Sequence, residues 1–581
     1  MTGCNRPAGR EDGWVRYDLR RNPPQVDTGR VSQEMAFLGE PTGSPNAKRR
    51  GGPQVAALKV AANAEMRWTV QLGQEPLLSF IPLERRRRGC TLRYRVDIEN
   101  GGQRERVFWV GGKHSRFGSA TVELPLDDYS GKKVDLFLST LGTNPSCTKV
   151  EAIWGNPAIW SRGSTPPPVG SSDQPNVLLI ALDTFRADYI GAYGRQPSPS
   201  PTLDALAAES DLYLQAFSTF NITNPSFASI MTGLFGKNHG VYDFGTPLPK
   251  EQTTLAELFK NDGYETAAVI SVRHLRAVQS GLGQGFDHVD YSTRQFAAEY
   301  VIDEGIEWLS ERQRPFFLWL HFFDPHVPLT PPRPYTRGFV AHDPGIGRPE
   351  DWREQRPPDD PKLGDYLKLY PSEVAYLDRQ IGRMMDFLDS RGLLETTIIA
   401  VVADHGENLG EHGIECQHNG LWDTTTHVPL MIRWPGPRDP SRGRRISDLV
   451  QTIDLYPTLA NAAGVGEPEL MEDRDGRDLR SDGRRRAVFA ETGKGGIMVR
   501  TADYLFFRSI DDPYVADGHY LFDLAADPDQ EINLAGRGLT VEAEMAAYAD
   551  NWLAAGRSTA QAIELSEEDL EDLRALGYLD P

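Results

Sequence analysis

Residues 176–183 read NVLLIALD, an apolar run of strand length that ends in an acid. Residues 397–405, TIIAVVADH, and residues 316–321, FFLWLH, repeat this pattern. Strands that are apolar on both faces are typical of a sheet that is covered on both sides. Helical patterns alternate with these strands, at Pro201–Glu209, Thr254–Asp262, Val301–Arg312 and Pro371–Arg391. The alternation predicts an α/β fold in which helices flank a mostly parallel sheet.

The composition of the 581 residues excludes several classes of protein. Hydrophobic residues make up 39% and charged residues 25%, as in globular proteins. Lys and Arg number 62 against 82 Asp and Glu, so the formal net charge is −20. A general nucleic-acid-binding protein needs a basic surface, so no nucleic-acid partner is predicted. No apolar run approaches the roughly 20 residues of a membrane helix, so no membrane span is predicted.

The chain falls into segments of different composition. The first fifty residues, rich in Pro, Gly, Arg and Gln, predict an extended or disordered segment. Residues 55–160 carry short alternating strands separated by glycine turns, which predict a β-sandwich. A Pro-rich and Ser-rich linker is predicted at 161–175, before the main α/β domain at 176–490. Residues 491–581 predict a small C-terminal α+β subdomain, with a hairpin in 497–508 and a short helix in 566–576.

The cysteines and the N-terminus leave two questions open. Four cysteines are too few for a disulfide framework or a zinc knuckle, and a bridge between Cys90 and Cys147 is one alternative to free thiols. The first ten residues lack the apolar core of a secretory signal, so none is predicted in the chain as given. Thr2-Gly3-Cys4 resembles the end of a lipoprotein cleavage box, so an extracytoplasmic location stays open if the true start lies upstream.

Acids and imidazoles follow three of the predicted buried strands. Asp183 follows the first strand, and Asp404 and His405 follow another. The third strand gives the group His321, Asp324 and His326. Ligands of such sheets bind at the carboxyl ends of the strands, where these side chains are expected to meet. Carboxylates and imidazoles together indicate a metal site, although a single acid after a strand is more often a turn or cap residue.

A hydroxyl-rich segment lies at 221–239, NITNPSFASIMTGLFGKNH. Thr223 stands where a predicted helix begins. The positive end of a helix favours an alkoxide and an anion that it attacks, so Thr223 is a candidate nucleophile. The alternative is that Thr223 or Ser226 is only a helix cap.

The order of these motifs resembles that of the sulfatase family of the alkaline phosphatase superfamily. The similar blocks are VLLIALDTFRADYIGAYG, TNPSFASIMTG, GKNHGV, FFDPHVP, ADHGENLGEHG, HVPLMIRWPG and TIDLYPTLANAAG, with LFDLAADPDQEINLA and LRALGYL near the end. The resemblance covers about Asn176 to Gly464. It implies an alkaline-phosphatase-like fold and a sulfatase-like catalytic domain.

The resemblance also implies roles for particular residues. Asp183, Asp404 and His405 match the ligands of a divalent metal, and Thr223 matches the nucleophile that faces the ion. Four further residues match positions that contact the substrate: Lys237 and His239 at the anionic group, and His326 and His418 at the leaving group. His418 stands where sulfatases usually have a lysine.

Two departures from the family pattern change the expected chemistry. Sulfatases that make formylglycine need Cys or Ser where this chain has Thr223, and oxidation of threonine would give a ketone. We therefore expect no formylglycine and a direct attack by Thr223, which favours phosphorus over sulfur. Thr184 replaces a second Asp, and His405 stands where the family often has Asn. An imidazole and fewer carboxylates favour one Mn²⁺ or Zn²⁺ ion, with Ca²⁺ as the alternative.

The sequence thus predicts a metal-dependent hydrolase that cleaves sulfate or phosphate esters and diesters. Its substrate would be an anionic ester of a small molecule, a saccharide or a lipid head group. One alternative is a phosphodiesterase, phosphonate monoesterase or phosphoglycerol-type transferase without sulfatase activity. Another is a non-catalytic polysaccharide-binding protein. A second ion at Asp324, His326 and His418 is a further alternative, and the sequence does not predict the oligomeric state.

Overall fold

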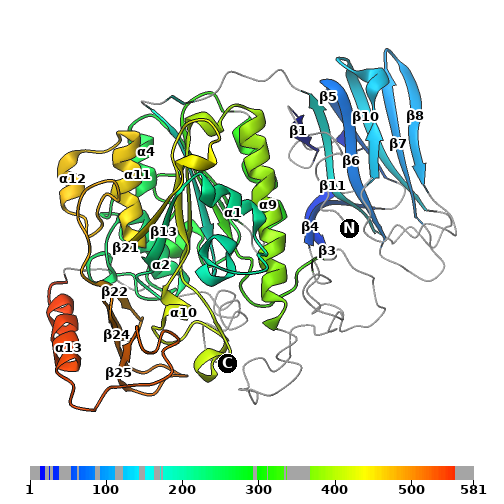
Figure 1. The fold of residues 1–581 in the computed structure, drawn as a ribbon. Helices are drawn as coiled ribbons and strands as arrows, with labels where there is room; N and C mark the ends of the chain where they lie inside the picture. The colour runs from blue at the N-terminus through cyan, green and yellow to red at the C-terminus, as the bar shows by residue number, and fades with distance from the viewer. Residues whose placement is uncertain are drawn as a thin grey trace.

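The computed structural model of the chain describes residues 14–19, 25–26, 31–37, 54–61, 64–84, 92–110, 122–142, 151–162, 170–171, 174–291, 297–310, 312–332, 335 and 367–556. Figure 1 shows a central sheet between layers of helices, a small C-terminal sheet beside helix α13, and a pair of β-sheets at the N-terminal end. Cys90, Cys147 and the predicted helix in 566–576 lie outside the described residues.

The central sheet has eight strands in the order β15-β14-β16-β12-β17-β20-β13-β21. Their bounds are β12 Asn176–Leu182, β13 Asp211–Phe217, β14 Glu265–Ile270, β15 His288–Tyr291, β16 Phe316–Phe322, β17 Thr397–Ala403, β20 Leu430–Arg433 and β21 Arg444–Gln451. The five strands from β15 to β17 are parallel. Strand β20 is antiparallel to both of its neighbours, and β13 and β21 are parallel. The predicted mostly parallel α/β sheet is confirmed.

Helices cover both faces of this sheet (Figure 1). The helices of this part of the chain are α1 Pro201–Ala208, α2 Thr223–Thr232, α3 Gly236–His239, α4 Leu255–Asn261, α5 Ala277–Ser280, α6 Ala298–Ser310, α9 Tyr370–Ser390, α10 Asp423–Thr426, α11 Leu455–Ala463 and α12 Pro468–Glu472. Leu178, Ile180 and Leu182 of β12 belong to a core shared with α1, α6 and α9. Val177, Leu179 and Ala181 belong to a second core, shared with α2, α4 and α11. The unbroken apolar run of β12 therefore reflects burial on both faces.

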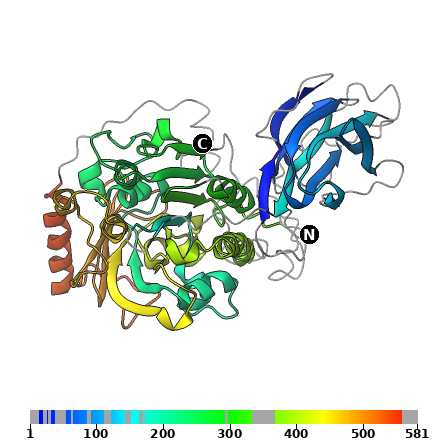
Figure 2. The same ribbon diagram turned by 90° about the horizontal axis from the view of Figure 1, so that it is seen from above.

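The N-terminal part contains two antiparallel sheets that form the layers of a sandwich (Figure 2). One contains β1 Trp14–Asp18, β3 Val31–Phe37, β4 Gln54–Ala61, β6 Gln74–Glu84, β9 Val122–Pro125 and β11 Glu151–Arg162. The other contains β2 Gln25–Val26, β5 Glu65–Gln71, β7 Leu92–Asn100, β8 Gln103–Val110 and β10 Lys133–Gly142. The rings of Phe80, Tyr94 and Trp154 meet in the core between them. Strands β1 to β3 lie within the first fifty residues, where only an extended or disordered segment is predicted.

The C-terminal part is a four-stranded antiparallel sheet with one long helix. Its elements are β22 Val488–Glu491, β23 Ile497–Arg500, β24 Tyr504–Ser509, β25 Gly518–Asp523 and α13 Thr540–Leu553. Strands β23 and β24 form the predicted hairpin. An isolated bridge between Phe220 and Glu491 joins this sheet to the segment that precedes α2. The C-terminal part therefore supports the start of the helix that carries Thr223.

The register of the central strands brings their carboxyl ends together. Leu182 pairs with Ala403 of β17 on one side and with Phe322 of β16 on the other. The backbone N–H of Asp404 donates to the carbonyl of Leu182 at 3.2 Å, and that of Asp183 donates to Phe322 at 3.0 Å. The acids that follow β12 and β17 are thus neighbours, as the sequence predicts for a parallel sheet.

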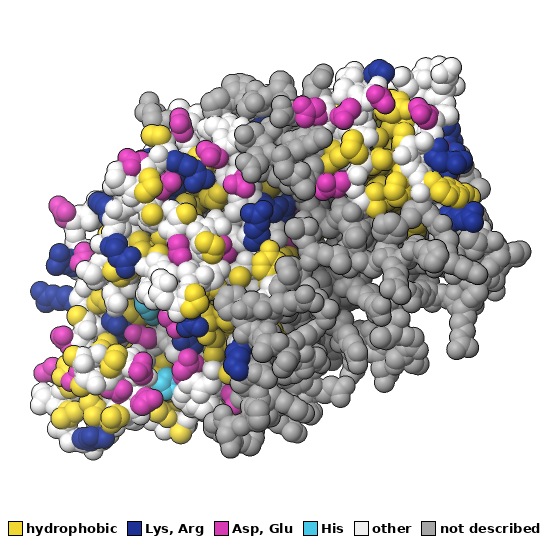
Figure 3. All heavy atoms as spheres, turned by 45° about the vertical axis from the view of Figure 1, so that its right-hand side comes forward, with side chains coloured by type: hydrophobic (Ala, Val, Ile, Leu, Met, Phe, Trp, Pro, Cys, Tyr) yellow, Lys and Arg dark blue, Asp and Glu magenta, His cyan; other side chains and the backbone are white. Residues whose placement is uncertain are grey.

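Two surface features bear on possible partners. In the view of Figure 3, acidic and basic side chains are intermixed over the described residues, without a continuous basic face. No helix in the described part of the chain combines the length and hydropathy that a membrane crossing requires.

Candidate active site and metal centre

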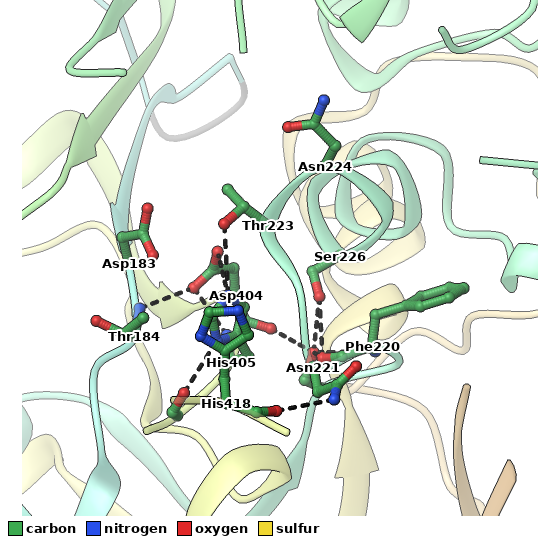
Figure 4. Close-up of polar contacts among 12 residues, drawn as sticks. Asp183, Thr184, Phe220, Asn221, Thr223, Asn224, Ser226, Asp404, His405 and His418 are labelled. Atoms are coloured by element: carbon green, nitrogen blue, oxygen red, sulfur yellow. Dashed lines mark hydrogen bonds and ion pairs between the residues drawn. The ribbon is translucent and has the colours of Figure 1, made fainter. Parts of the chain in front are cut away.

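Asp183, Asp404 and His405 form a compact group at the carboxyl edge of the sheet (Figure 4). One ligand atom from each lies within 4.8 Å of the others, and all three side chains are fully buried. Among the described residues, this is the one group of three or more acids, histidines or cysteines with such spacing. Two carboxylates and an imidazole are a ligand set for a divalent transition metal.

Hydrogen bonds from two backbone N–H groups fix the orientation of the Asp404 carboxylate. Its Oδ1 accepts hydrogen bonds from the backbone N–H of His405 at 2.8 Å and of Thr184 at 3.1 Å. Its Oδ2 has no hydrogen-bond partner. Thr184 has a φ of 51°, a left-handed conformation that costs energy for a β-branched residue. The hydroxyl of Tyr370 stabilises this turn, because it donates to the Thr184 carbonyl at 2.8 Å and accepts from the Arg186 N–H at 3.0 Å.

The buried carboxylates of Asp183 and Asp404 would be stabilised by a nearby cation. Neither carboxylate oxygen of Asp183 has a hydrogen-bond partner. Burial, together with the nearby Asp404 and Glu407, holds the pKa of Asp183 well above its usual range. Burial also raises the pKa of Asp404 to about 8, against the hydrogen bonds it accepts. Unpaired buried carboxylates are costly unless a positive charge neutralises them, so these residues fit a divalent ion.

The His405 imidazole is oriented to offer one nitrogen. Its Nδ1 lies 2.9 Å from the carbonyl oxygen of Gly406, which accepts the Nδ1 proton. Burial lowers the pKa of His405 to about 4, so the ring is neutral. The Nε2 lone pair is then available to a metal.

Thr223 lies beside this group. Its Oγ1 is 3.4 Å from Nε2 of His405, and its side chain is fully buried (Figure 4). Helix α2 begins at Thr223 and its N-cap residue is Ile222, so Thr223 is not the N-cap. Ser226 lies one turn further on, where its hydroxyl donates to the carbonyl of Phe220 at 3.1 Å. The helix start therefore directs the hydroxyl of Thr223, and not that of Ser226, to the group of ligands.

His326 and His418 line the same region. The ring centroids of His405 and His418 are 4.7 Å apart, and those of His326 and His418 are 6.1 Å apart. Nδ1 of His418 lies 3.9 Å from the carboxylate of the buried Glu407. Burial, with His405 and His326 nearby, keeps the pKa of His418 well below its usual range. The structure thus brings both predicted leaving-group histidines close to His405 of the candidate metal site.

Lys237 and His239 make their contacts elsewhere. The Lys237 ammonium donates to the carbonyl of Trp552 at 2.6 Å and lies 4.0 Å from that indole ring. His239 Nδ1 accepts from the N–H of Val241 at 3.0 Å, and its Nε2 lies 3.0 Å from the Ser229 hydroxyl. Both ring nitrogens of His239 are therefore occupied within the protein. Through these contacts the two residues join α2, α3 and α13, and their anion-binding roles stay a prediction.

The site contains two further histidines. The sequence predicts no role for His274, and it predicts His321 only as one of the acids and imidazoles that mark a metal site at the strand ends. His274 follows β14, and its Nδ1 lies 2.9 Å from the side-chain oxygen of Asn224 at the start of α2. Burial lowers its pKa, as do the nearby His321, His326 and His405, so His274 lies in the same cluster of imidazoles. His321 is the second, with its Nε2 3.7 Å from Oδ2 of Asp183. The rule that ligands bind at strand ends, applied to β14 as well, could have found His274.

Asp324 does not join the metal ligands. Its Oδ2 accepts from the backbone N–H of Ala298 at 2.9 Å, at the start of α6. Burial raises its pKa to about 6, against that hydrogen bond and one with Glu373. The alternative of a second ion at Asp324, His326 and His418 therefore finds no cluster among the described residues.

Comparisons with known proteins agree with this geometry. The family model described as Sulfatase matches residues 175–465. An ulvan-active sulfatase of Formosa agariphila is 25% identical over 407 residues, which cover 63% of this chain and 78% of that protein. Human iduronate 2-sulfatase is 28% identical over 389 residues, which cover 51% of this chain and 70% of that protein.

Solved structures share the fold. A phosphonate monoester hydrolase of Agrobacterium radiobacter superposes with a TM-score of 0.53 at 24% identity, covering 68% of this chain and 99% of that one. A 2-O GAG sulfatase superposes with a TM-score of 0.53 at 22% identity, covering 67% and 95%. At these identities the likeness establishes the fold alone.

Proposed function

The chain belongs to the sulfatase family of the alkaline phosphatase superfamily and is a hydrolase of sulfuric or phosphoric esters, and we propose that Thr223 is its nucleophile. The observation that carries the proposal is the position of Thr223 Oγ1, which is buried 3.4 Å from His405 Nε2 in the group that fits a metal ion. A hydroxyl needs activation to attack an ester, and a site of this kind can provide it.

The proposed ion would be held by Asp183, Asp404 and the Nε2 atom of His405. Mn²⁺ and Zn²⁺ suit this set better than Ca²⁺, which prefers more oxygen ligands. When bound, the ion would supply the positive charge that offsets the charge of the ester and favours the deprotonated hydroxyl. The carboxylate oxygens without hydrogen-bond partners support this assignment.

The residues of the chain account for a two-step reaction. The Thr223 hydroxyl gives its proton to a neutral imidazole of the cluster as Oγ1 bonds to the phosphorus or sulfur of the ester, and the bond to the alcohol oxygen breaks. His326 or His418 gives a proton to the departing alcohol. Water then attacks the threonine ester: its hydroxyl bonds to phosphorus or sulfur, and its remaining proton restores the Thr223 hydroxyl. The released acid is a phosphate monoester from a phosphodiester, a phosphonate from a phosphonate ester, and inorganic sulfate or phosphate from a monoester. The imidazoles on one side of the ligand group suit a proton donor there.

The methyl group of Thr223 favours phosphorus over sulfur as the site of attack. A formylglycine hydrate can expel sulfate by breaking a carbon–oxygen bond, and a threonine ester cannot do so. The sulfated threonine would instead have to be hydrolysed at sulfur. We therefore favour a phosphodiester or phosphonate ester as the better substrate, with no formylglycine in the protein. A sulfate ester is the second candidate, supported by relatives named for sulfatase activity.

For the alcohol part of the substrate, only a broad chemical class is proposed. Relatives carry names such as N-acetylglucosamine-6-O-sulfatase, and one structural neighbour was solved with a disulfated glucosamine. These names support an anionic ester of a saccharide. An ester of a small molecule or a lipid head group is the alternative.

Hydrolysis of chromogenic esters tests the proposed function. The purified full chain is assayed with bis-p-nitrophenyl phosphate, p-nitrophenyl phosphate and p-nitrophenyl sulfate, each with Mn²⁺, Zn²⁺, Ca²⁺ or a chelator. We expect the diester to be cleaved fastest and the chelator to abolish cleavage. Thr223→Ala should lower kcat by about 10³-fold or more, whereas Thr223→Ser should keep a measurable rate. If every ester is inert and Thr223→Ala changes nothing, the non-catalytic alternative holds.

A further inference from the structure

We propose that His321, oriented by Ser271, is the positioning residue that holds the Asp183 carboxylate ready to bind the ion. The inference rests on the proposed function only in taking Asp183 as a metal ligand. The register of the sheet places the His321 side chain beside Asp183. His321 takes no part in the two-step reaction proposed above.

The register of β16 against β12 places His321 beside the acid. His321 pairs with Ala181, two residues before Asp183. Residues two apart on a strand point to the same face, so His321 and Asp183 share one face of the sheet. The Nε2 atom of His321 lies 3.7 Å from Oδ2 of Asp183, and both side chains are fully buried.

The imidazole of His321 is fixed by its neighbours. Phe227 of α2 packs edge-on against it, with ring centroids 5.1 Å apart, and the Trp319 ring lies 6.2 Å away. On the opposite edge of the imidazole, Nδ1 lies 2.8 Å from the hydroxyl of Ser271, which directly follows β14. Three elements thus set the direction in which Nε2 points.

The hydrogen bond to Ser271 determines which nitrogen carries the proton. If the Ser271 hydroxyl donates to Nδ1, the neutral ring carries its proton on Nε2, which faces Asp183. A proton on Nε2 of His321 attracts the anionic carboxylate of Asp183. At 3.7 Å it leaves the oxygen lone pairs of Asp183 available to a metal ion. Nε2 of His321 has no hydrogen-bond partner, and the group it faces, at 3.7 Å, is the Asp183 carboxylate.

Asp183 needs such support more than Asp404 does. Two backbone N–H groups orient Asp404, whereas neither oxygen of Asp183 accepts a hydrogen bond. His321 is also not a member of the compact group of ligand atoms, so it reaches the ion site through Asp183. A residue behind a ligand typically changes metal affinity by about 10- to 100-fold.

Metal affinity of the ion-free full chain tests the inference. Competition with a chromogenic chelator gives the Kd for Mn²⁺ of the wild type, His321→Ala and His321→Gln. We expect His321→Ala to weaken binding about 10- to 100-fold. His321→Gln should recover most of it, because the Gln amide can donate from nearly the position of Nε2. Ser271→Ala, which keeps the imidazole, should weaken binding less than His321→Ala does.

His427→Ala is the matched control. His427 also packs against an aromatic ring, Phe217, and its Nε2 lies 2.9 Å from the carbonyl of Leu214. This control should leave the Kd for Mn²⁺ unchanged even if it lowers thermal stability. Equal losses in His321→Ala and His427→Ala would show a merely structural role and overturn the inference.

Cobalt substitution separates positioning from ligation. The visible absorption of Co²⁺ reports which atoms bind it, so a positioning residue should leave the band positions of His321→Gln unchanged at saturating Co²⁺. A change in these bands would make His321 a ligand and contradict the proposal. If the wild type itself binds no divalent ion, the proposed function fails. If the wild type binds and His321→Ala binds equally well, only this inference fails.

Discussion

Lys237 has two candidate roles: binding the anionic group of the substrate, as the sequence predicts, and holding α3 against α13. Its ammonium donates to the Trp552 carbonyl and lies over the Trp552 ring, so it ties α3 to α13. We expect Lys237→Met to lower the free energy of unfolding by about 1–3 kcal/mol, since a hydrogen bond and a cation–π contact are lost. KM for the best ester should change by less than about twofold, which is within about 0.4 kcal/mol.

Chemical denaturation and steady-state kinetics of Lys237→Met measure both effects. A rise in KM of tenfold or more at unchanged stability would instead support the anion-binding role that the sequence predicts. The sequence could not decide between these roles, because the partner of Lys237 lies more than 300 positions further along the chain.

The buried acids make the stability of the ion-free protein depend on pH. Burial raises the pKa of Asp404 to about 8, compared with an ordinary value of 3.8. Between these values the folded protein binds the proton more tightly than the unfolded chain does. The free energy of unfolding should therefore fall as the pH rises from about 4 towards 8, and Asp183 contributes in the same direction.

A divalent ion should reverse this loss, because it replaces the proton as the partner of the carboxylates. Thermal unfolding is measured with a chelator and with excess Mn²⁺, at about pH 5 and about pH 8. We expect the stabilisation by Mn²⁺ to be larger at the higher pH. Stabilisation that is equal at both values, or larger at the lower one, would contradict the assignment of these carboxylates as ligands.

At the scale of elements, the start of α9 supports the metal site through one hydroxyl. Tyr370 OH bridges the carbonyl of Thr184 and the N–H of Arg186, and so holds the left-handed turn between Asp183 and the next segment. Tyr370→Phe leaves these backbone groups buried without that partner. We expect a loss of about 1–3 kcal/mol in the free energy of unfolding, together with weaker binding of Mn²⁺.

Denaturation and chelator competition on Tyr370→Phe give these two quantities. The matched control is Tyr456→Phe, which removes a buried hydroxyl that donates to the carbonyl of Thr253 at 3.3 Å. Tyr456→Phe should affect stability alone. Unaltered Mn²⁺ affinity in Tyr370→Phe would show that the turn does not need this bridge.

The elements of the central sheet could be predicted because each carries a strong local signal. The apolar runs of β12, β16 and β17 are buried on both faces, and the amphipathic pattern of α9 marks a long surface helix. The first three strands lack such signals, because β1 and β3 are stabilised by pairing with β11 and β4. Pairing between distant segments is not visible in a local pattern.

The candidate site was predictable where its residues end parallel strands. Asp183, Asp404 and His405 follow β12 and β17, and the fold brings them within 4.8 Å of one another. His321 precedes the end of β16, and its contact with Asp183 depends on strand register. Register between parallel strands is set by the whole sheet, so the sequence places His321 among the strand-end groups but does not predict its contact with Asp183.

At the scale of the whole molecule, each part bears differently on the candidate site. The two cores on the faces of the central sheet fix the strand ends that carry the proposed metal ligands. The C-terminal sheet bridges to the segment before α2 and so supports Thr223. The N-terminal sandwich has its own core around Trp154. The chemistry is therefore a property of the α/β part and its C-terminal neighbour.

Covalent trapping on Thr223 tests the central claim most directly. The full chain with Mn²⁺ is mixed with a phosphodiester, quenched in acid within the first turnover, digested and analysed by peptide mass spectrometry. We expect Thr223 of the wild type to carry the phosphoryl group together with its remaining ester group, and the same peptide of Thr223→Ala to carry neither. Turnover of the diester with Thr223 unmodified, or a phosphoryl group on a different residue, would contradict it.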